Sequence, residues 1–453
     1  MTAGKREGRE QTDSAFLVGA AEVDITPPLG VPMAGSLNDK RGADGIADPL
    51  MLKVIVLESG GVRLACASFD LCYLPRTLGD KAVAEAAAAT GIAADHITWS
   101  CTHTHSGPVS WGERIKDPDS PMHEWLAELP ARFAECVKAA DAAQVPARVS
   151  RARAYGRGVG ENRRLRYKDG RELNRWVLGR DPDEHQCVGS ADLIDPEIGM
   201  LIFEDLDGQI LSVLWTYALH ANAKFGMQFS ADYPGVTAAR LREKFGDQTI
   251  ALYLPGTCGD INPNGTYEQV GNKLAEAMIP KIESRKPWSG PIPLAACKKT
   301  ITVPCRDYME DQEQRIRDSL WGPASQDYFR SAQKRLQREG VMEREAVLHA
   351  WHLGDTGFVA FPGEVFVRWG LKVKQESPFP WTFPVELSNG PLGYLITQQA
   401  WEAGGYEALV AYTGLISVRG VEMMVEEGLA MLGELHASCA QEQTAAAPAL
   451  ALG

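Results

Sequence analysis

The sequence contains no run of about 18 consecutive apolar residues, the length that a membrane-spanning helix needs, so we expect no stable membrane insertion. Residues 1–14 are polar and charged and lack the apolar core of a signal peptide. Together these two absences predict a cytoplasmic protein. Basic residues are in the minority, with 46 Lys and Arg against 59 Asp and Glu and a formal net charge of −13. Because no dense basic surface is available, we expect no nucleic-acid partner.

Paired cysteine motifs are also missing. The nine cysteines are odd in number and none stands in a CxxC pair, so neither a disulfide framework nor a cysteine zinc site is indicated. Reduced, mostly buried thiols are the simpler interpretation. The pattern gives no indication of an oligomeric state.

What is present is an ordinary globular composition, with 45% hydrophobic and 23% charged residues in a chain of 453. A substantial core is therefore available. We find no internal repeat and no clear linker. We predict one large catalytic domain over residues 16–437, between a disordered N-terminus at 1–15 and a disordered Ala/Gln-rich tail at 438–453.

Strands alternate with helices along the chain. A strand over 16–24 precedes a hairpin of 52–58 and 62–69, and a helix over 77–90 leads to a strand over 96–101. Further elements follow in the same manner, with strands over 147–155, 198–204, 210–219, 249–254 and 346–361 and helices over 124–143, 233–245, 268–284, 304–339 and 420–436. This order predicts an α/β fold, with mixed central β-sheets flanked by helices.

The most informative segment is Thr102-His103-Thr104-His105-Ser106-Gly107-Pro108. The run before it, residues 96–101, contains apolar and β-branched residues and is typical of a strand. Residues two apart on a strand point to the same face. His103 and His105 are therefore expected to face the same space, where two imidazoles bind a metal or move protons. The alternative is a pair of polar residues at a solvated strand end.

Other polar residues lie just past the ends of apolar strands, beside Gly or Pro. They are His220, Asp260, Glu364 and Tyr394. Taken singly, each has an ordinary structural interpretation, as a core histidine, a helix-terminal carboxylate or a half-buried aromatic. In sheets flanked by helices, however, ligands bind outside the strand ends, so the set favours one shared site.

Together these residues resemble the neutral (non-lysosomal) ceramidases and the zinc amidohydrolases that share their N-terminal catalytic domain. The resemblance runs from about Phe16 to about Glu426. It is carried by segments 19–28, 102–108, 162–164, 230–235, 259–263 and 362–364, together with His220, Tyr394 and Tyr406.

The resemblance implies a site for one Zn²⁺ per chain, held by His103, His220, Glu364 and Tyr394. It implies that His105 carries the proton between the attacking water and the leaving amine of a small-molecule substrate. Further positions that match the family are Tyr406 and Arg163, expected to stabilise the oxyanion, and Asn162 and Asn262, expected to bind substrate. Asn262 stands where ceramidases have a serine.

The resemblance weakens on the substrate side. The chain stops before the C-terminal immunoglobulin-like domain of the ceramidases, and no extra apolar helix or loop is available to line a pocket for two acyl chains. The long Arg-rich loop at 156–195 suggests a polar or anionic substrate instead. Two alternatives stay open. One is a zinc hydrolase of an ester, lactone or glycosidic bond in a polar metabolite, and the other is a non-catalytic relative of the family.

Overall fold

The computed structural model describes residues 16–446 except 36–41, 112–114, 116 and 308–310, and its side chains as far as Cys439. The N-terminal segment predicted as disordered and residues 447–453 lie outside the described residues. None of the described helices is long and apolar enough to cross a membrane.

The largest sheet has eight strands, in the order β14-β12-β11-β6-β1-β3-β4-β5. Their bounds are β1 Leu17–Asp24, β3 Met51–Ser59, β4 Val62–Phe69, β5 Ile97–Cys101, β6 Val145–Tyr155, β11 Glu197–Asp205, β12 Ile210–Tyr217 and β14 Ile250–Pro255. Each half contains an antiparallel hairpin followed by a helix and a parallel edge strand. The halves join at β1 and β6 through only two residue pairs, and the sheet folds there so that β14 contacts β3, β4 and β5.

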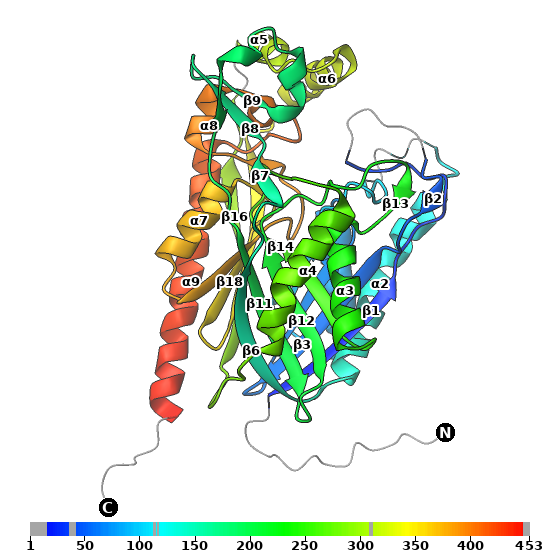
Figure 1. The fold of residues 1–453 in the computed structure, drawn as a ribbon, viewed down its shortest axis with the longest axis vertical. Coiled ribbons are helices and arrows are strands. Elements are labelled where there is room, and N and C mark those ends of the chain that lie inside the picture. The colour runs from blue at the N-terminus through cyan, green and yellow to red at the C-terminus, as the bar shows by residue number, and fades with distance from the viewer. Residues whose placement is uncertain (1–15, 36–41, 112–114, 116, 308–310, 447–453) are drawn as a thin grey trace, which may run out of the picture.

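Helices cover the outer face of each half (Figure 1). They are α1 Arg76–Thr90 and α2 Met122–Ala142 on one half, and α3 Asp232–Phe245 and α4 Tyr267–Glu283 on the other. The sequence accounts for the C-terminal end of α1. This helix is followed directly by Gly91, which adopts the left-handed conformation (φ 72°) that glycine tolerates without steric cost.

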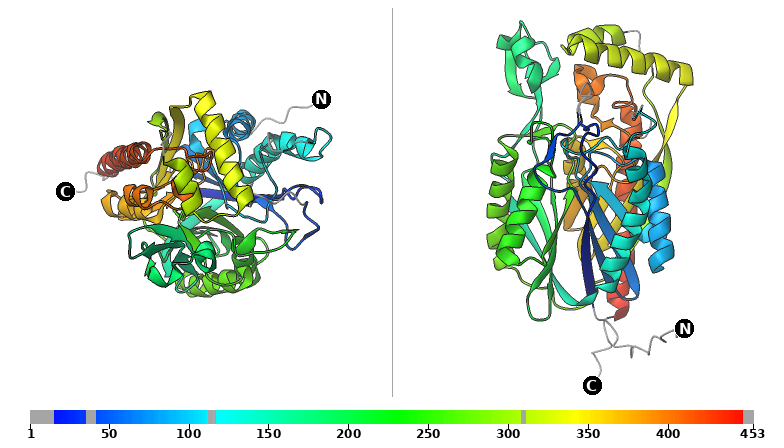
Figure 2. Two further views of the ribbon diagram at one scale, coloured as in Figure 1. Left: turned by 90° about the horizontal axis from the view of Figure 1, so that it is seen from above. Right: turned by 90° about the vertical axis from the view of Figure 1, so that its right-hand side faces the viewer.

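A second sheet packs against the inner face of the first. It consists of β16 Leu294–Pro304, β17 Glu343–Leu353, β18 Thr356–Ala360 and β20 Trp381–Val385. One apolar cluster lies between the two sheets, and another joins the second sheet to α9 Val418–Ala446, the long red helix in Figure 2. The result is one large domain of helix, sheet, sheet and helix layers, which confirms the predicted α/β fold with mixed sheets flanked by helices.

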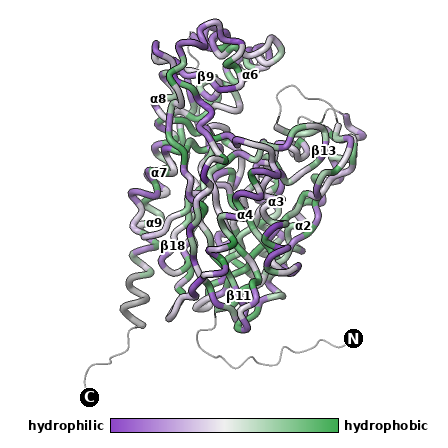
Figure 3. The backbone as a smooth tube through the Cα atoms, viewed as in Figure 1, coloured by the Kyte–Doolittle hydropathy of each residue, from purple (hydrophilic) through white to green (hydrophobic). Residues whose placement is uncertain are grey.

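Above these layers the chain forms a cap of short elements (Figure 1). The segment predicted as a long loop, 156–195, contains β7 Gly160–Asn162 and a small sheet of β8 Arg164–Tyr167, β9 Glu172–Asn174 and β10 Cys187–Ser190. Helices α5 Gln312–Asp318, α6 Pro323–Glu339 and α8 Gln398–Ala403 complete the cap. Outside it, α7 Val367–Glu376 contacts β20 and α9, and β2 Gly45–Ile46 pairs with β13 Gln228–Phe229. Strand β15 Ile261–Pro263 pairs with β7. The backbone coloured by hydropathy shows this cap as mostly hydrophilic, in contrast to the strands below it (Figure 3).

The structure differs from the predicted elements at one helix end and at one strand. Helix α9 continues through residues 438–446, which we expected to be a disordered tail, because Ala, Gln and Glu are strong helix formers. Strand β16 was missed, since Lys298, Lys299 and Thr300 interrupt the apolar pattern by which a buried strand is predicted.

Candidate active site

His103 and His105 come together, but not because they alternate along a strand. Strand β5 ends at Cys101, and His103 has φ 64°, a left-handed conformation that few non-glycine residues adopt. The backbone amide of His103 donates to the carbonyl of Leu71, and that of His105 donates to the carbonyl of Ala221. This turn, rather than strand geometry, brings the two Nε2 atoms to 3.3 Å from each other.

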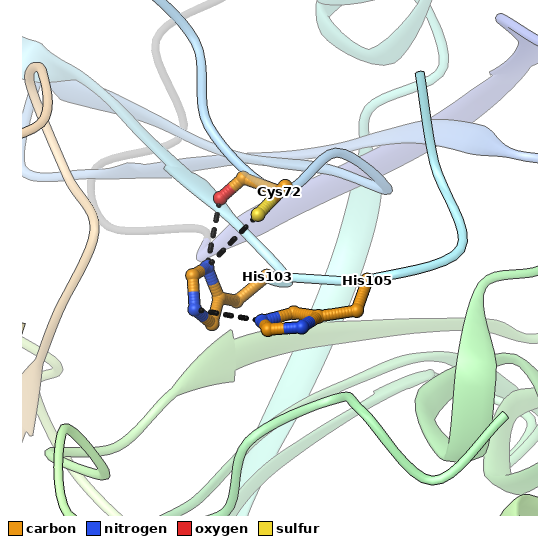
Figure 4. Close-up of side chains that lie close together, drawn as sticks. All are labelled: Cys72, His103 and His105. Atoms are coloured by element: carbon orange, nitrogen blue, oxygen red, sulfur yellow. Dashed lines mark hydrogen bonds between the residues drawn. The ribbon is translucent and has the colours of Figure 1, made fainter. Parts of the chain in front are cut away.

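The tautomer of His103 is fixed by a neighbour that the sequence did not single out. Its Nδ1 lies 2.9 Å from the backbone carbonyl oxygen of Cys72 and 3.6 Å from the Cys72 sulfur (Figure 4). Because a carbonyl only accepts, Nδ1 carries a hydrogen, which leaves Nε2 as the nitrogen that can bind a metal. His220 is held in the same way, with Nδ1 2.7 Å from the carbonyl of Cys258.

Glu364 completes the group. Its Oε2 lies 3.3 Å from Nε2 of His103 and 3.2 Å from Nε2 of His220. Its Oε1 accepts a hydrogen bond from the hydroxyl of Tyr73, another residue that the sequence analysis missed. Burial alone would raise the pKa of Glu364, but His103 and His220 hold that pKa well below its usual range.

The backbone places Glu364 next to a second predicted ligand. Glu364 and Tyr394 are register partners in the parallel pair β19 Glu364–Val365 and β21 Tyr394–Leu395. Gly259 also approaches this strand, so closely that a Cβ there would lie 2.5 Å from the carbonyl oxygen of Glu364. The residue must therefore be glycine for the strand to lie where it does.

The donor set fits a zinc ion. The ligand atoms of His103, His220 and Glu364 all lie within 4.8 Å of one another. In a tetrahedral zinc site with bonds of about 2.05 Å, neighbouring ligand atoms are about 3.3 Å apart, close to the two separations from Glu364. Backbone carbonyls that hold the far nitrogens of both imidazoles are the usual support of histidine ligands.

His105 and His220 differ in their surroundings from His103. Burial, together with His103 and His220, lowers the pKa of His105 well below its usual range. Burial and then the guanidinium of Arg163 lower the pKa of His220 to about 4. Burial also acts on His103, but Cys72 and Glu364 outweigh it and raise the pKa of His103. Both His105 and His220 are therefore neutral near pH 7.

Arg163 reaches the same centre from the cap. Its Nη1 lies 3.2 Å from Nε2 of His220, and its Nε donates to Oε1 of Glu407 at 2.9 Å. Its guanidinium carbon lies 5.1 Å from the ring centre of Tyr394. Glu407, which the sequence analysis did not select, thus anchors Arg163 beside the predicted ligands.

The two predicted asparagines lie differently. Asn262 is half-buried, and its Oδ1 accepts weakly from Nη1 of Arg163 at 3.4 Å. Asn162 is buried, and its Nδ2 donates to Asp260 at 2.7 Å while its Oδ1 accepts from the amide of Arg164 at 3.1 Å. Its amide is thus engaged within the protein, and neither asparagine is among the residues that line the cavity.

A cavity of about 460 Å³ opens beside the histidines. It is lined by His103, His105, Tyr394 and Tyr406, and its other aromatic lining residues include Tyr73 and Trp111. The ring of Tyr406 packs 5.4 Å from that of Tyr394. The cavity thus brings together a candidate metal ligand, a neutral imidazole and phenols, with Arg163 close behind at His220, an arrangement that suits hydrolysis of a small molecule.

The sequence matches no model of a known protein family and no curated protein. The structure is similar to the crystal structure of neutral ceramidase from Pseudomonas aeruginosa, with a TM-score of 0.69 and 16% identity over 93% of this chain and 75% of that chain. It is also similar to a structure described as ceramidase complexed with C2, with a TM-score of 0.72 and 16% identity over 94% and 76% of the two chains. The chain therefore has the neutral ceramidase fold, as the sequence motifs predicted.

Proposed function

We propose that this chain is a zinc-dependent hydrolase that cleaves an amide (N-acyl) bond with an activated water, using one zinc ion per chain. The observation that carries the proposal is the meeting of Nε2 of His103, Nε2 of His220 and Oε2 of Glu364 beside a cavity. Both solved structures reported above are described as ceramidases, which supports amide hydrolysis as the reaction.

In this proposal His103, His220, Glu364 and Tyr394 hold the ion. With these four residues as ligands, water would be a fifth ligand, a coordination number that catalytic zinc sites can reach. When bound, zinc lowers the pKa of a water molecule towards about 7 and polarises the carbonyl group of the substrate.

His105 takes the proton of the attacking water and passes it to the leaving amine. It suits this role because its ring is neutral and its Nε2 faces the same centre as that of His103. Arg163 and Tyr406 supply hydrogen-bond donors for the negative charge that develops on the carbonyl oxygen, a contribution of about 3–4 kcal/mol for one such donor.

The test is metal analysis of the purified chain, followed by hydrolysis of a panel of amides, esters and glycosides. We expect about one zinc per chain, amide hydrolysis that stops when a chelator removes the metal, and recovery on adding Zn²⁺. Stoichiometric zinc with no hydrolysis of any compound would instead identify a binding relative. Preferential cleavage of esters or glycosides would contradict the proposed bond.

A further inference from the structure

Arg163 reaches the histidines, but most of the other arginines of residues 156–195 pair with acidic residues of the protein, contrary to the expectation that this segment faces the substrate. Arg163 and Arg164 both pair with Glu407, Arg164 and Arg166 with Glu172, Arg171 with Asp181, and Arg175 with Glu161. Among the residues that the structure describes, no arginine of this segment lines the cavity. Their charges are used to hold the cap together.

The cavity has cationic groups from another part of the chain. Arg335 of α6 and Arg344 at the start of β17 both line it. Tyr328 lines it as well, and it lies seven residues before Arg335, so two turns of α6 present the two side chains on one face.

Arg335 belongs to a small polar group at this end of the cavity. Its Nε lies 2.7 Å from Oε1 of Glu339, and its guanidinium lies 5.4 Å from the ring centre of Tyr412. The hydroxyl of Tyr412 donates to the other carboxylate oxygen of Glu339 at 3.1 Å. Glu339 therefore balances one positive charge at this end.

Arg344 has no such balance. Its Nη1 donates to the carbonyl of the adjacent Glu343 at 3.3 Å, and in the described part of the chain no carboxylate lies within ion-pair distance of it. Glu345, its other neighbour, pairs with Arg76 at 2.9 Å. Arg344, a half-buried residue of the cavity wall, thus has no ion pair of its own among the described residues, although with Arg335 it lowers the pKa of Glu339.

We propose that Arg344, with Arg335 beside it, binds a compact anionic group of the substrate, in the simplest case a carboxylate. The substrate class is then an N-acyl amide with an anionic group on one side of the scissile bond. This inference rests on the proposed amide hydrolysis and adds the recognition of the substrate. His103, His105 and Arg344 all line this one cavity, which has the volume to hold a small molecule that contacts both groups.

An anionic substrate fits this wall better than a neutral lipid. A guanidinium that is covered by an uncharged chain loses water without gaining a partner, which is unfavourable. A carboxylate makes a charge-assisted, bidentate contact with arginine that is roughly twice as strong as a neutral hydrogen bond. The cavity therefore selects by charge.

The test uses N-acyl amino acids of graded length with a free carboxylate, each matched with its neutral carboxamide. For the best pair we expect kcat/KM to be at least about 10-fold higher with the carboxylate. Arg344→Gln should bring the ratio of kcat/KM for the carboxylate to that for the carboxamide close to 1, chiefly by raising KM for the carboxylate. Arg338→Gln, an exposed arginine of α6 outside the cavity lining, is the matched control.

Two outcomes separate this inference from the proposed function. If wild type hydrolyses both members of each pair equally and Arg344→Gln changes neither, the anion site is wrong while the hydrolase stands. If no amide is hydrolysed, the proposed function fails, and calorimetric binding of the same pairs to the zinc-loaded protein still decides the anion site. A carboxylate preference that disappears in Arg344→Gln supports the anion site, and equal binding overturns it.

Discussion

Oε2 of Glu364 lies 3.2 Å from Nε2 of His220, although neither atom has a hydrogen to donate to the other. Nδ1 of His220 carries the ring proton because it lies 2.7 Å from the carbonyl of Cys258, and the pKa of His220 is lowered to about 4. Two lone pairs that face each other in the protein interior repel, and a nearby positive charge is needed to offset this repulsion. Arg163 supplies part of it at 3.2 Å from Nε2, and a bound metal ion supplies the rest in the proposed enzyme.

The two histidines of the first motif should differ in what they contribute. We expect His103→Ala to lose both the zinc and the activity, because it removes a ligand. His105→Ala should keep about one zinc per chain and lose activity by about 10²–10⁴-fold, the usual contribution of an acid–base group. Metal content by mass spectrometry and steady-state kinetics measure the two effects.

The matched control for this pair is His123→Ala, an exposed histidine of α2 outside the cavity. It should keep both metal and activity. Full turnover in both His103→Ala and His105→Ala would refute the assignment. Loss of metal in His105→Ala would show that His105 is itself a ligand.

Tyr73 should tune the metal site without contributing a ligand to it. Its hydroxyl donates to Oε1 of Glu364, which leaves Oε2 directed at His103 and His220. Tyr73→Phe keeps the ring that packs 4.9 Å from His103, so the fold should be retained. Because supports of this kind are worth about 10- to 100-fold in metal affinity, we expect a loss of that size.

Zinc affinity in this variant is measured by competition with a chromophoric chelator. Tyr155→Phe, at an exposed tyrosine, is the control and should bind zinc like wild type. Equal affinity in Tyr73→Phe would show that Glu364 is positioned by its backbone pairing with Tyr394 alone.

The sequence predicted which residues meet at the site better than it predicted how they meet. The strand-end pattern selected a set of residues because those past the ends of buried strands reach the same crevice: His103, His105, His220, Asp260, Glu364 and Tyr394. Of these, Asp260 accepts from Asn162 and from the amide of Val367 instead, and the choice of the ligands came from the family resemblance. The convergence of His103 and His105, however, depends on a left-handed turn, which a period-two pattern does not describe.

The residues that the sequence analysis missed act through contacts between distant segments. Cys72 contributes a backbone carbonyl, a group that every residue has, so its side chain gives no signal. Tyr73 lies shortly after β4, which ends at Phe69. The search for polar residues past strand ends would have selected it if it had included every tyrosine. Glu407 follows Tyr406, but its pairing with Arg163, 244 positions earlier, appears only in the folded chain.

The buried charge network behind Arg163 should be essential for stability. Glu407 accepts from Nε of Arg163 at 2.9 Å and from Nη1 of Arg164 at 2.6 Å. Glu407→Gln removes the negative charge and leaves buried guanidiniums without full compensation, so we expect a loss of about 3–5 kcal/mol in the free energy of unfolding. Chemical denaturation measures it.

The control here is Glu243→Gln, which removes an exposed ion pair with Arg240 on α3. Such pairs contribute little, and the denaturation midpoint should not change. If Glu407→Gln were as stable as this control, the network would not hold the cap in place. Lower kcat in Glu407→Gln at unchanged metal content would further indicate that Glu407 positions Arg163.

His349 should make the fold sensitive to acid. It is fully buried in β17, in register with Lys298 of β16, and burial and then this lysine lower its pKa to about 3. The unfolded chain takes up a proton near pH 6.5, whereas the folded chain takes it up only near pH 3. Stability is therefore lost as the pH falls through 6.5, by about 1.4 kcal/mol for each pH unit, or about 2 kcal/mol at pH 5.

The comparison of wild type with His349→Leu and His349→Gln isolates this effect, because neither substituted side chain titrates. Groups that shift in the other direction, such as Asp232 with its pKa raised to about 7, are present in all three proteins and cancel in the difference. Between pH 7.5 and pH 5, wild type should lose about 2 kcal/mol more unfolding free energy than either variant. Parallel stability curves would mean that His349 accepts a proton in the folded state, and the space around it would then have to admit water or a counter-charge.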